Sequence, residues 1–266
     1  MRSFWALLFL MVPVFGVVAF VLSAISTHAW LPENISSTGK DIDHLFNVIL
    51  LITGIFFIIT EVLLVIAMFR GRGQHNGKAA YTHGNRQLEI GWTVMTALIL
   101  LFIAFYQMPA WKKSKYQSQK PKTEPDALVT ASQFLWEVRY PAWDASTGKP
   151  RKLNTLSPVL GESFQKIGEL HVAPNEPVLI HLTTRDVIHS FWLPNCRVKQ
   201  DSLPGHIIPV WFDANKPGEY EWVCAELCGW GHFTMRAKLV VHESRAEYEQ
   251  WLREETKKQL GAVAGK

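Results

Sequence analysis

The sequence lacks the features that mark several large functional classes. Its 266 residues contain no repeat, no low-complexity tract and no glycine-rich phosphate-binding loop, and a net charge of +4 is too small to favour nucleic acid as a partner. Three cysteines, an odd number, exclude a complete disulfide framework. No Cys-x-x-Cys-His motif occurs, so we expect no c-type haem domain in this chain.

Apolar residues, in contrast, are abundant and unevenly distributed. The chain is 48% apolar and contains eleven tryptophans. Residues 1–111 hold only six of the 27 basic and five of the 23 acidic residues, and they include three long apolar segments. This division predicts a membrane anchor followed by one soluble domain.

The three apolar segments are each long enough to cross the hydrocarbon core as a helix, which takes about 20 residues. They are residues 4–25, 45–69 and 90–111. The first has two interpretations, because Arg2 before it and the sequence STHAW after it also fit a secretory signal cleaved after Ala29. We therefore expect a helix or a signal over residues 1–29 and a helical hairpin over residues 30–111.

The charges between the second and third segments predict the orientation. This loop carries Arg70, Arg72, Lys78 and Arg86 and no acidic residue, which is typical of a cytoplasmic loop. We therefore expect a multi-pass protein of the bacterial cytoplasmic membrane, with its C-terminal domain on the periplasmic side.

Two acidic residues lie in or beside the membrane segments. Glu61 falls about 13 Å inside the bilayer when measured from Arg70 along a helix. It either handles protons or makes a polar contact with a partner helix. Glu89 stands at the cytoplasmic start of the third segment, where the positive end of the helix macrodipole also favours a carboxylate.

Beyond a polar linker over residues 112–126, short alternating stretches replace the helical pattern. Each places apolar side chains on one face, and turns rich in glycine and proline separate them. The clearest are residues 176–184, 218–224 and 237–243. They predict an antiparallel sandwich or barrel over residues 127–245. A helix-favouring tail over residues 246–266 follows, which could dock through Tyr248, Trp251 and Leu252.

The stretch CAELCGWGHFTM, from Cys224 to Met235, concentrates possible metal ligands. A local disulfide between Cys224 and Cys228 is one interpretation in an oxidising compartment. His232 and Met235 add imidazole and thioether donors, a soft set that favours copper, whereas zinc gains little from the thioether. One thiolate suffices for a mononuclear blue-copper centre, so the second cysteine favours two copper ions bridged by both thiolates.

A binuclear centre needs a second imidazole and a weak ligand such as a backbone carbonyl. The stretch RDVIHSFWLP places His189 directly after a predicted strand, beside aromatic residues that would exclude water. His189 is therefore the best candidate. The remaining histidines of this domain are expected to be ordinary surface or core residues: His171, His181, His206 and His242.

In this order, the motifs resemble subunit II of the haem-copper cytochrome c oxidases. The resemblance covers residues 40–245 and rests on the copper loop, on DVIHSFWLP and DSLPG before it, and on a helical hairpin ending in NRQLEIGWT. It implies an α+β membrane protein whose helical anchor precedes an all-β, cupredoxin-like Greek-key sandwich. It also implies the ligands of a binuclear CuA centre: His189, Cys224, the backbone carbonyl of Glu226, Cys228, His232 and Met235.

The resemblance implies further roles. The Glu226 carboxylate would bind a magnesium ion shared with subunit I, Glu89 would open a proton-uptake pathway, and Asp186 would help to dock cytochrome c or cap a turn. CuA would accept electrons from cytochrome c or another c-type cytochrome. They would pass to haem in subunit I of a proton-translocating oxidase that reduces oxygen to water.

Three residues depart from the pattern of that family. Phe134 stands where the family has the tryptophan that first accepts electrons, and Trp136 follows it. Trp230 lies in the ligand loop, where it either forms a new electron-accepting surface or packs over the copper. Cys196 is expected to be a buried apolar residue rather than an oxidation-prone thiol.

The charge of the soluble domain leaves the donor open, because 21 basic residues against 18 acidic ones do not predict the negative surface that a basic cytochrome needs. Two other functions stay possible on the sequence, the CuA subunit of a nitric oxide reductase and a membrane-tethered copper carrier.

Overall fold

A computed structural model describes residues 2–27, 31–70, 83–156 and 161–261. Contacts divide the chain into two compact units, Met1–Pro32 with Asp43–Pro109, and Glu33–Ile42 with Ala110–Lys266. The possible cleavage point at Ala29 and most of the predicted cytoplasmic loop, including Arg72 and Lys78, lie outside the described residues.

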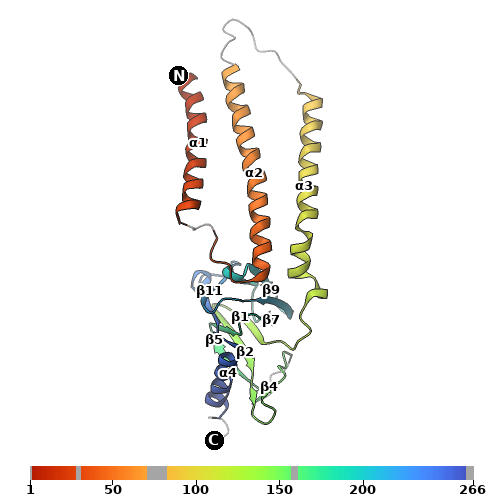
Figure 1. Ribbon diagram of the computed structural model, residues 1–266, viewed down its shortest axis with the longest axis vertical. Helices are drawn as coiled ribbons and strands as arrows, with labels where there is room; N and C mark the ends of the chain where they lie inside the picture. Colours follow the sequence, from red (N-terminus) through yellow and green to blue (C-terminus); the bar gives the residue numbers. More distant parts are fainter. Residues whose placement is uncertain (1, 28–30, 71–82, 157–160, 262–266) are drawn as a thin grey trace. The chain divides into compact units, whose positions relative to one another are not determined.

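The first unit is helical (Figure 1). Helix α1 spans Arg2–Thr27, α2 spans Ser37–Arg70 and α3 spans Arg86–Lys115. Each is longer at both ends than the apolar segment that predicts it. In α3 the last turn is extended by three lysines, which the negative end of the helix macrodipole favours. The helix therefore runs into the predicted linker, and the irregular segment begins after Lys115.

Within the described residues, α2 and α3 are long and apolar enough to cross a membrane, whereas α1 contributes a shorter apolar stretch, Leu7–Ser23. Apolar side chains of the two long helices are exposed, among them Leu51 at 64% and Leu98 at 62%. A helix with exposed apolar residues all round needs lipid or another protein to cover it, so this unit is a membrane anchor.

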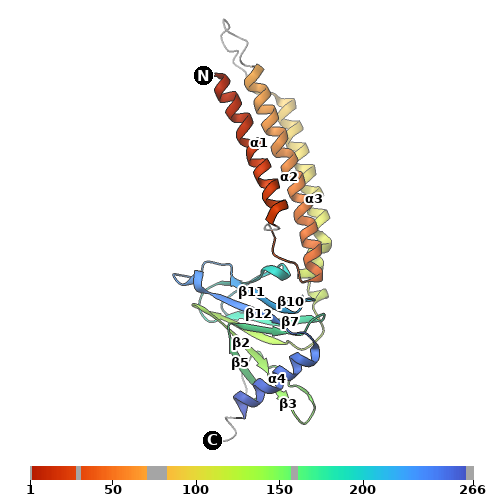
Figure 2. The same ribbon diagram turned by 60° about the vertical axis from the view of Figure 1, so that its left-hand side comes forward.

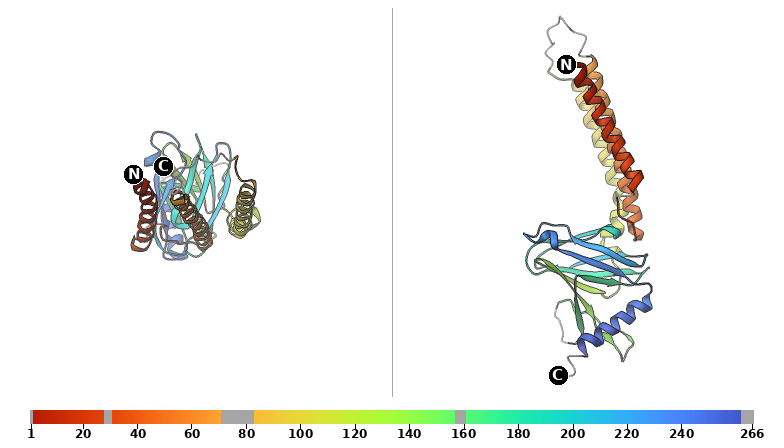
Figure 3. Two further views of the ribbon diagram at one scale, coloured as in Figure 1. Left: turned by 90° about the horizontal axis from the view of Figure 1, so that it is seen from above. Right: turned by 90° about the vertical axis from the view of Figure 1, so that its left-hand side faces the viewer.

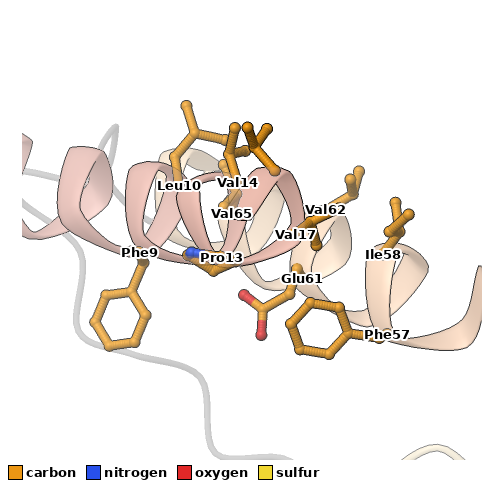
Figure 4. A pocket seen from close by; sticks show the side chains of 11 residues that line it. Phe9, Leu10, Pro13, Val14, Val17, Phe57, Ile58, Glu61, Val62 and Val65 are labelled. Carbon is orange, nitrogen blue, oxygen red and sulfur yellow. The ribbon is translucent and has the colours of Figure 1, made fainter. Parts of the chain in front are cut away.

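Glu61 lies on the wall of a pocket of about 230 Å³ within the helical unit. Figure 4 shows its carboxylate pointing between Phe9 and Phe57, close to Pro13. The Oε2 atom is buried, and among the described residues it has no hydrogen-bond partner. The other lining residues are all apolar: Phe9, Leu10, Pro13, Val14, Val17, Val18, Phe57, Ile58, Val62 and Val65. Proton handling and a polar contact with a partner helix both stay predictions for Glu61.

The second unit is a β-sandwich, and Figures 2 and 3 show its strands stacked in two layers. One sheet has the order β10-β7-β1-β2-β5. Its strands are Ile208–Asp213, Pro177–Thr184, Ala127–Ser132, Leu135–Pro141 and Ser163–Ile167. The other sheet has the order β6-β12-β11-β8-β9. Its strands are Glu169–Val172, Arg236–Val241, Gly218–Cys224, His189–Leu193 and Val198–Ser202. A small hairpin pairs β3, Trp143–Asp144, with β4, Lys149–Pro150.

The three stretches with alternating patterns form β7, β11 and β12, which confirms the strand predictions. The prediction of purely antiparallel pairing is wrong for two pairs, because β1 with β7 and β6 with β12 are parallel. The partners in each pair are far apart in the sequence, so the chain passes between the sheets before they meet. Periodicity within one strand carries no information on such pairing.

The space between the sheets is filled by aromatic and aliphatic side chains. Trp136, Phe191 and Trp222 are at most 1% exposed, with ring centroids of Trp136 and Trp222 4.9 Å apart and those of Phe191 and Trp222 5.1 Å apart. Burial of such residues is the main stabilising term of a sandwich, at roughly 25 cal/mol per Å² of apolar surface.

A segment before α2 completes this core. Ile35 is fully buried in it, its N–H donates to the Asn195 carbonyl and its own carbonyl accepts from the Asn215 N–H. The neighbouring Ser36 hydroxyl donates to the carbonyl of Cys196 at 3.0 Å. Cys196 itself is fully buried, as expected, and burial raises the pKa of its thiol to about 12.

Helix α4, Arg245–Leu260, lies beside β5 and β3 and is the blue helix of Figure 2. Ser244 caps it by accepting the N–H of Glu247. The predicted docking residues are confirmed, since Tyr248 and Leu252 are buried and Trp251 is partly buried against the core. The Gln259 side chain accepts from the N–H of Gln165 and donates to its carbonyl, so it occupies the free side of the edge strand β5.

Candidate metal centre

The two cysteines of the loop between β11 and β12 face each other without a bond. Cys224 ends β11, and its Sγ lies 4.0 Å from that of Cys228. A disulfide bond is about 2.05 Å long, so the disulfide interpretation fails. Both thiols are buried, and a metal bound to both at about 2.3 Å fits between them. Burial and the neighbouring Cys224 raise the pKa of the Cys228 thiol to about 11, so a metal would replace a proton there.

Each thiol has its own imidazole neighbour. His189 Nδ1 lies 3.9 Å from Cys224 Sγ, and His232 Nδ1 lies 3.6 Å from Cys228 Sγ. The Met235 sulfur lies 3.9 Å from Cys228 Sγ. Within the described parts of the chain, His189, Cys224 and Cys228 are a buried group with ligand atoms all within 4.8 Å of one another. The structure thus brings together all five predicted side-chain ligands.

The strands explain how a histidine 35 residues before Cys224 reaches the loop. His189 is the first residue of β8, and β8 pairs with β11 so that Phe191 lies opposite Cys224. Two backbone bonds close the loop, from the Cys224 N–H to the Met235 carbonyl and from the Ala225 N–H to the Ser190 carbonyl. His189 and Cys224 therefore stand on paired strands, and backbone bonds fasten both ends of the loop that carries the other three donors.

Glu226 presents two different groups. Its backbone carbonyl lies 3.3 Å from Cys224 Sγ and so faces the thiol pair, as expected of a weak ligand. Its side chain is exposed at the surface of the domain. The residue can therefore contribute to the buried site and to a second, surface site at once.

Asp186 fixes the orientation of His189. Its carboxylate accepts from His189 Nε2 at 2.8 Å and from the N–H groups of Gln133 and Val187, each at 2.7 Å. Partial burial alone would raise the pKa of Asp186, but these hydrogen bonds outweigh it and lower the pKa to about 2. The carboxylate thus holds the ring with Nδ1 toward Cys224. The turn-capping alternative is confirmed, while the docking role stays a prediction.

The tip of the β1–β2 hairpin clamps the copper loop. The Gln133 side chain donates to the Cys228 carbonyl, and the half-buried Phe134 ring lies against Gly229 and Gly231. A methyl group on Gly231 would overlap that ring. Gly229 also has a φ of +130°, which other residues rarely adopt. These roles of Gln133 and the two glycines were missed, although two glycines around the tryptophan of a ligand loop are a signal of close approach.

The candidate electron-accepting residues differ sharply in exposure. Trp136 is 1% exposed and packs against His189, with ring centroids 6.1 Å apart. Trp230 is 89% exposed, so the expectation that it packs over the copper is wrong. The ring that covers the loop is Phe134, because the hairpin tip reaches over the two glycines.

The remaining candidates make no contact with the two thiols within the described parts of the chain. His206 is exposed and His181 is half-buried, while His171 and His242 are buried and contact each other through Nδ1 and Nε2 at 3.1 Å. These positions confirm them as ordinary surface or core histidines. Glu89 lies in the first turn of α3 and is exposed.

Comparison with known families identifies both units. The family "cytochrome c oxidase subunit II, periplasmic domain" matches residues 130–243, and "cytochrome c oxidase subunit II, transmembrane domain" matches residues 24–109. The chain belongs to the cytochrome c oxidase subunit II family. Its fold is accordingly a helical membrane anchor followed by a cupredoxin-like sandwich, and it is a subunit of a haem-copper terminal oxidase.

Individual relatives of the subunit II family cover most of the chain. Cytochrome c oxidase subunit 2 of Thermostichus vulcanus is 30% identical over 85% of this chain and 79% of its own length. Alternative cytochrome c oxidase subunit 2 of Bradyrhizobium diazoefficiens is 30% identical over 89% of this chain and 87% of its own. The crystal structure of the periplasmic domain of subunit II from Bradyrhizobium japonicum is 28% identical, covers 52% of this chain and 97% of that one, and superimposes with a TM-score of 0.41.

Proposed function

We propose that this chain accepts electrons from a c-type cytochrome at a binuclear copper centre, CuA, and passes them toward haem in subunit I, where oxygen is reduced to water. The observation that carries the proposal is the meeting of five soft donors inside the sandwich. They are His189 Nδ1, Cys224 Sγ, Cys228 Sγ, His232 Nδ1 and Met235 Sδ. When bound, the copper pair would take up and release one electron.

The arrangement of the donors fits two ions rather than one. Each thiol has a different imidazole beside it, His189 for Cys224 and His232 for Cys228, so each of two ions would have its own imidazole ligand. Met235 and the Glu226 carbonyl supply one weak donor each. Two thiolates, two imidazoles and a thioether suit copper better than zinc.

The protein holds the proposed ligands in fixed positions and excludes water from them. His189 is fully buried, the two thiols are at most 8% exposed, and Trp136 and Phe191 pack nearby. Buried donors on two paired strands and on a loop fastened to them by backbone bonds need little rearrangement when the charge of the site changes. The same burial disfavours the copper-carrier alternative, because a carrier must exchange its ion readily.

The exposed Glu226 carboxylate supports a second proposal, a magnesium ion shared with subunit I. Hard cations prefer oxygen ligands, and magnesium usually takes one or two carboxylates from a protein. Because the carbonyl of the same residue faces Cys224 Sγ, a change in the position of Glu226 at one site would also move its ligand group at the other.

Differences in exposure reduce the candidates for the electron-accepting residue to two. Trp136, at 1% exposed, cannot touch a donor and instead supports the His189 ring. Phe134, half-buried over the loop, and Trp230, fully at the surface, are the residues that a donor can reach. We propose that electrons arrive through one of these two.

The anchor supports the predicted placement in a bacterial cytoplasmic membrane, with the copper domain on the periplasmic side. In that orientation α3 begins on the cytoplasmic side. Glu89, exposed in its first turn, would then stand where protons enter from the cytoplasm.

The test uses the full chain in detergent, loaded with copper, and electron paramagnetic resonance. Two copper nuclei that share one electron would produce a seven-line hyperfine pattern with a purple colour. The variant Cys228→Ser should abolish this pattern, whereas Cys196→Ser, which alters the buried thiol outside the site, should keep it. A four-line spectrum from a blue protein would overturn the binuclear proposal. Oxygen uptake by the purified complex distinguishes an oxidase from a nitric oxide reductase.

A further inference from the structure

The copper loop carries an exposed aromatic surface. Trp230 is 89% exposed and Phe233 is 69% exposed, and their rings contact each other edge to face with centroids 6.3 Å apart. The Phe134 ring lies against the two glycines that flank Trp230 in the sequence. We call Phe134, Trp230 and Phe233 the aromatic patch.

The segments that form the aromatic patch contain no charged residue of the Asp, Glu, Lys or Arg type. This holds for the loop from Cys228 to Met235 and for the hairpin tip from Ser132 to Leu135. An electron donor that approaches these two segments therefore meets uncharged side chains and backbone.

Among the charged residues that border these segments along the chain, Glu226 is exposed and is the residue proposed above for the magnesium site. Three others already have partners. Glu137 accepts from Arg185 at 2.7 Å, and Arg236 pairs with Glu221 at 3.3 Å. The Asp186 carboxylate is held by His189 and by two backbone N–H groups. The carboxylates of Glu137, Glu221 and Asp186 thus have local cationic or N–H partners, and they offer little attraction to a ring of lysines on a donor.

Trp230 of the aromatic patch is also separated from two proposed ligands by only a few bonds along the chain. One glycine separates Trp230 from His232, and one separates it from Cys228. Large exposed aromatic residues are uncommon on a solvated surface, and tryptophan is the residue most enriched among those that dominate binding energy at interfaces. The patch therefore combines access to the copper loop with the composition of a binding surface.

On the basis of the proposed function, we infer that the aromatic patch is the docking surface for the electron donor, and that it suits a c-type cytochrome whose haem edge is surrounded by uncharged, apolar side chains. Recognition then depends on apolar contact rather than on attraction between opposite charges. Because salt screens only the latter, electron transfer to this chain should depend weakly on ionic strength.

The experiment is stopped-flow reduction of the copper-loaded full chain by two reduced cytochromes, one with an uncharged haem edge and one with a lysine-ringed edge. The uncharged one should react faster, with a rate that changes less than about threefold between about 10 and 200 mM salt. Trp230→Ala should lower that rate about tenfold or more, while Trp230→Phe keeps most of it. Leu156→Ala, at an 85% exposed residue in the loop after β4, should have no effect.

A faster reaction with the lysine-ringed cytochrome and a steep fall of its rate with salt would overturn the inference. So would an unchanged rate in Trp230→Ala. A small reductant, hexaammineruthenium(II), reduces the copper centre without docking at the patch, so its rate reports on the centre alone. If Trp230→Ala slows this reaction equally, the variant has damaged the centre, and Phe233→Ser then decides by the same comparison. The absence of a two-copper spectrum from the unaltered chain would instead refute the proposed function.

Discussion

Replacing Asp186 by alanine should weaken the metal centre without removing a proposed ligand. The carboxylate of Asp186 accepts from His189 Nε2 at 2.8 Å and from the N–H groups of Gln133 and Val187. The alanine variant loses these three hydrogen bonds, and packing against side chains such as Trp136 is then left to orient the imidazole ring.

The magnitude follows from the exposure of the three donors. Gln133 and Val187 are exposed, so water can replace the lost acceptor for their N–H groups. His189 is fully buried, and an unpaired buried donor costs about 1–3 kcal/mol. Loss of a group that orients a ligating histidine typically weakens metal binding about 10- to 100-fold, or about 1.4–2.8 kcal/mol. The first cost should appear in the stability of the copper-free chain, and the second in copper affinity.

Competition between the full chain and a copper chelator measures this affinity, and chemical denaturation of the copper-free chain measures stability in parallel. Asp186→Asn is the matched control, because it keeps an oxygen for His189 and should lose clearly less affinity. A copper affinity of Asp186→Ala within about twofold of the unaltered chain would refute the reasoning.

Three further predictions concern the scaffold around the site. Ile35→Ala should lower the free energy of unfolding of the sandwich by about 2–4 kcal/mol in denaturation followed by tryptophan fluorescence, and Ile35→Val by about 1; an unchanged midpoint would show that this segment is not part of the core. Gly231→Ala should cost about 1–3 kcal/mol because its methyl group overlaps Phe134, and adding Phe134→Ala should recover part of the loss; a double variant no more stable than Gly231→Ala would contradict that contact. Burial lowers the pKa of His171 from 6.5 to about 4 and also lowers that of His242. As the pH falls below about 6.5 the unfolded chain therefore binds protons that the folded chain does not, and the free energy of unfolding should fall by up to about 1.4 kcal/mol per pH unit for His171 until about pH 4, with a contribution of the same sign from His242; His171→Gln should flatten the profile, and an equally steep profile in that variant would contradict the assignment.

Local sequence patterns were sufficient for the strands that carry the site. The side chains of a strand alternate with a period of two, so β11 could be read from Tyr220, Trp222 and Cys224 alone. The proposed ligands from Cys224 to Met235 could be picked out for a similar reason, because their spacing and chemistry are local. His189 required the position of a second strand end, which the neighbouring aromatic residues indicated.

Contacts between distant parts of the chain left no comparable signal. Ile35 enters the core beside Asn195, 160 residues later, although it precedes a membrane helix and looks like part of a polar loop. The bond from Gln133 to Cys228 and the contact of Phe134 with Gly231 likewise join segments about 95 residues apart. Such contacts depend on how two sheets face each other, which no residue spacing within either segment encodes.

The side chain of Gln259 imitates a peptide group. Its amide offers Gln165 one acceptor and one donor, which is what an additional strand would present to β5. A bare edge of that kind invites neighbouring copies to join their sheets into fibres. Helix α4 therefore blocks the edge of β5. Neighbouring copies at high density on a membrane then cannot join their sheets through this strand.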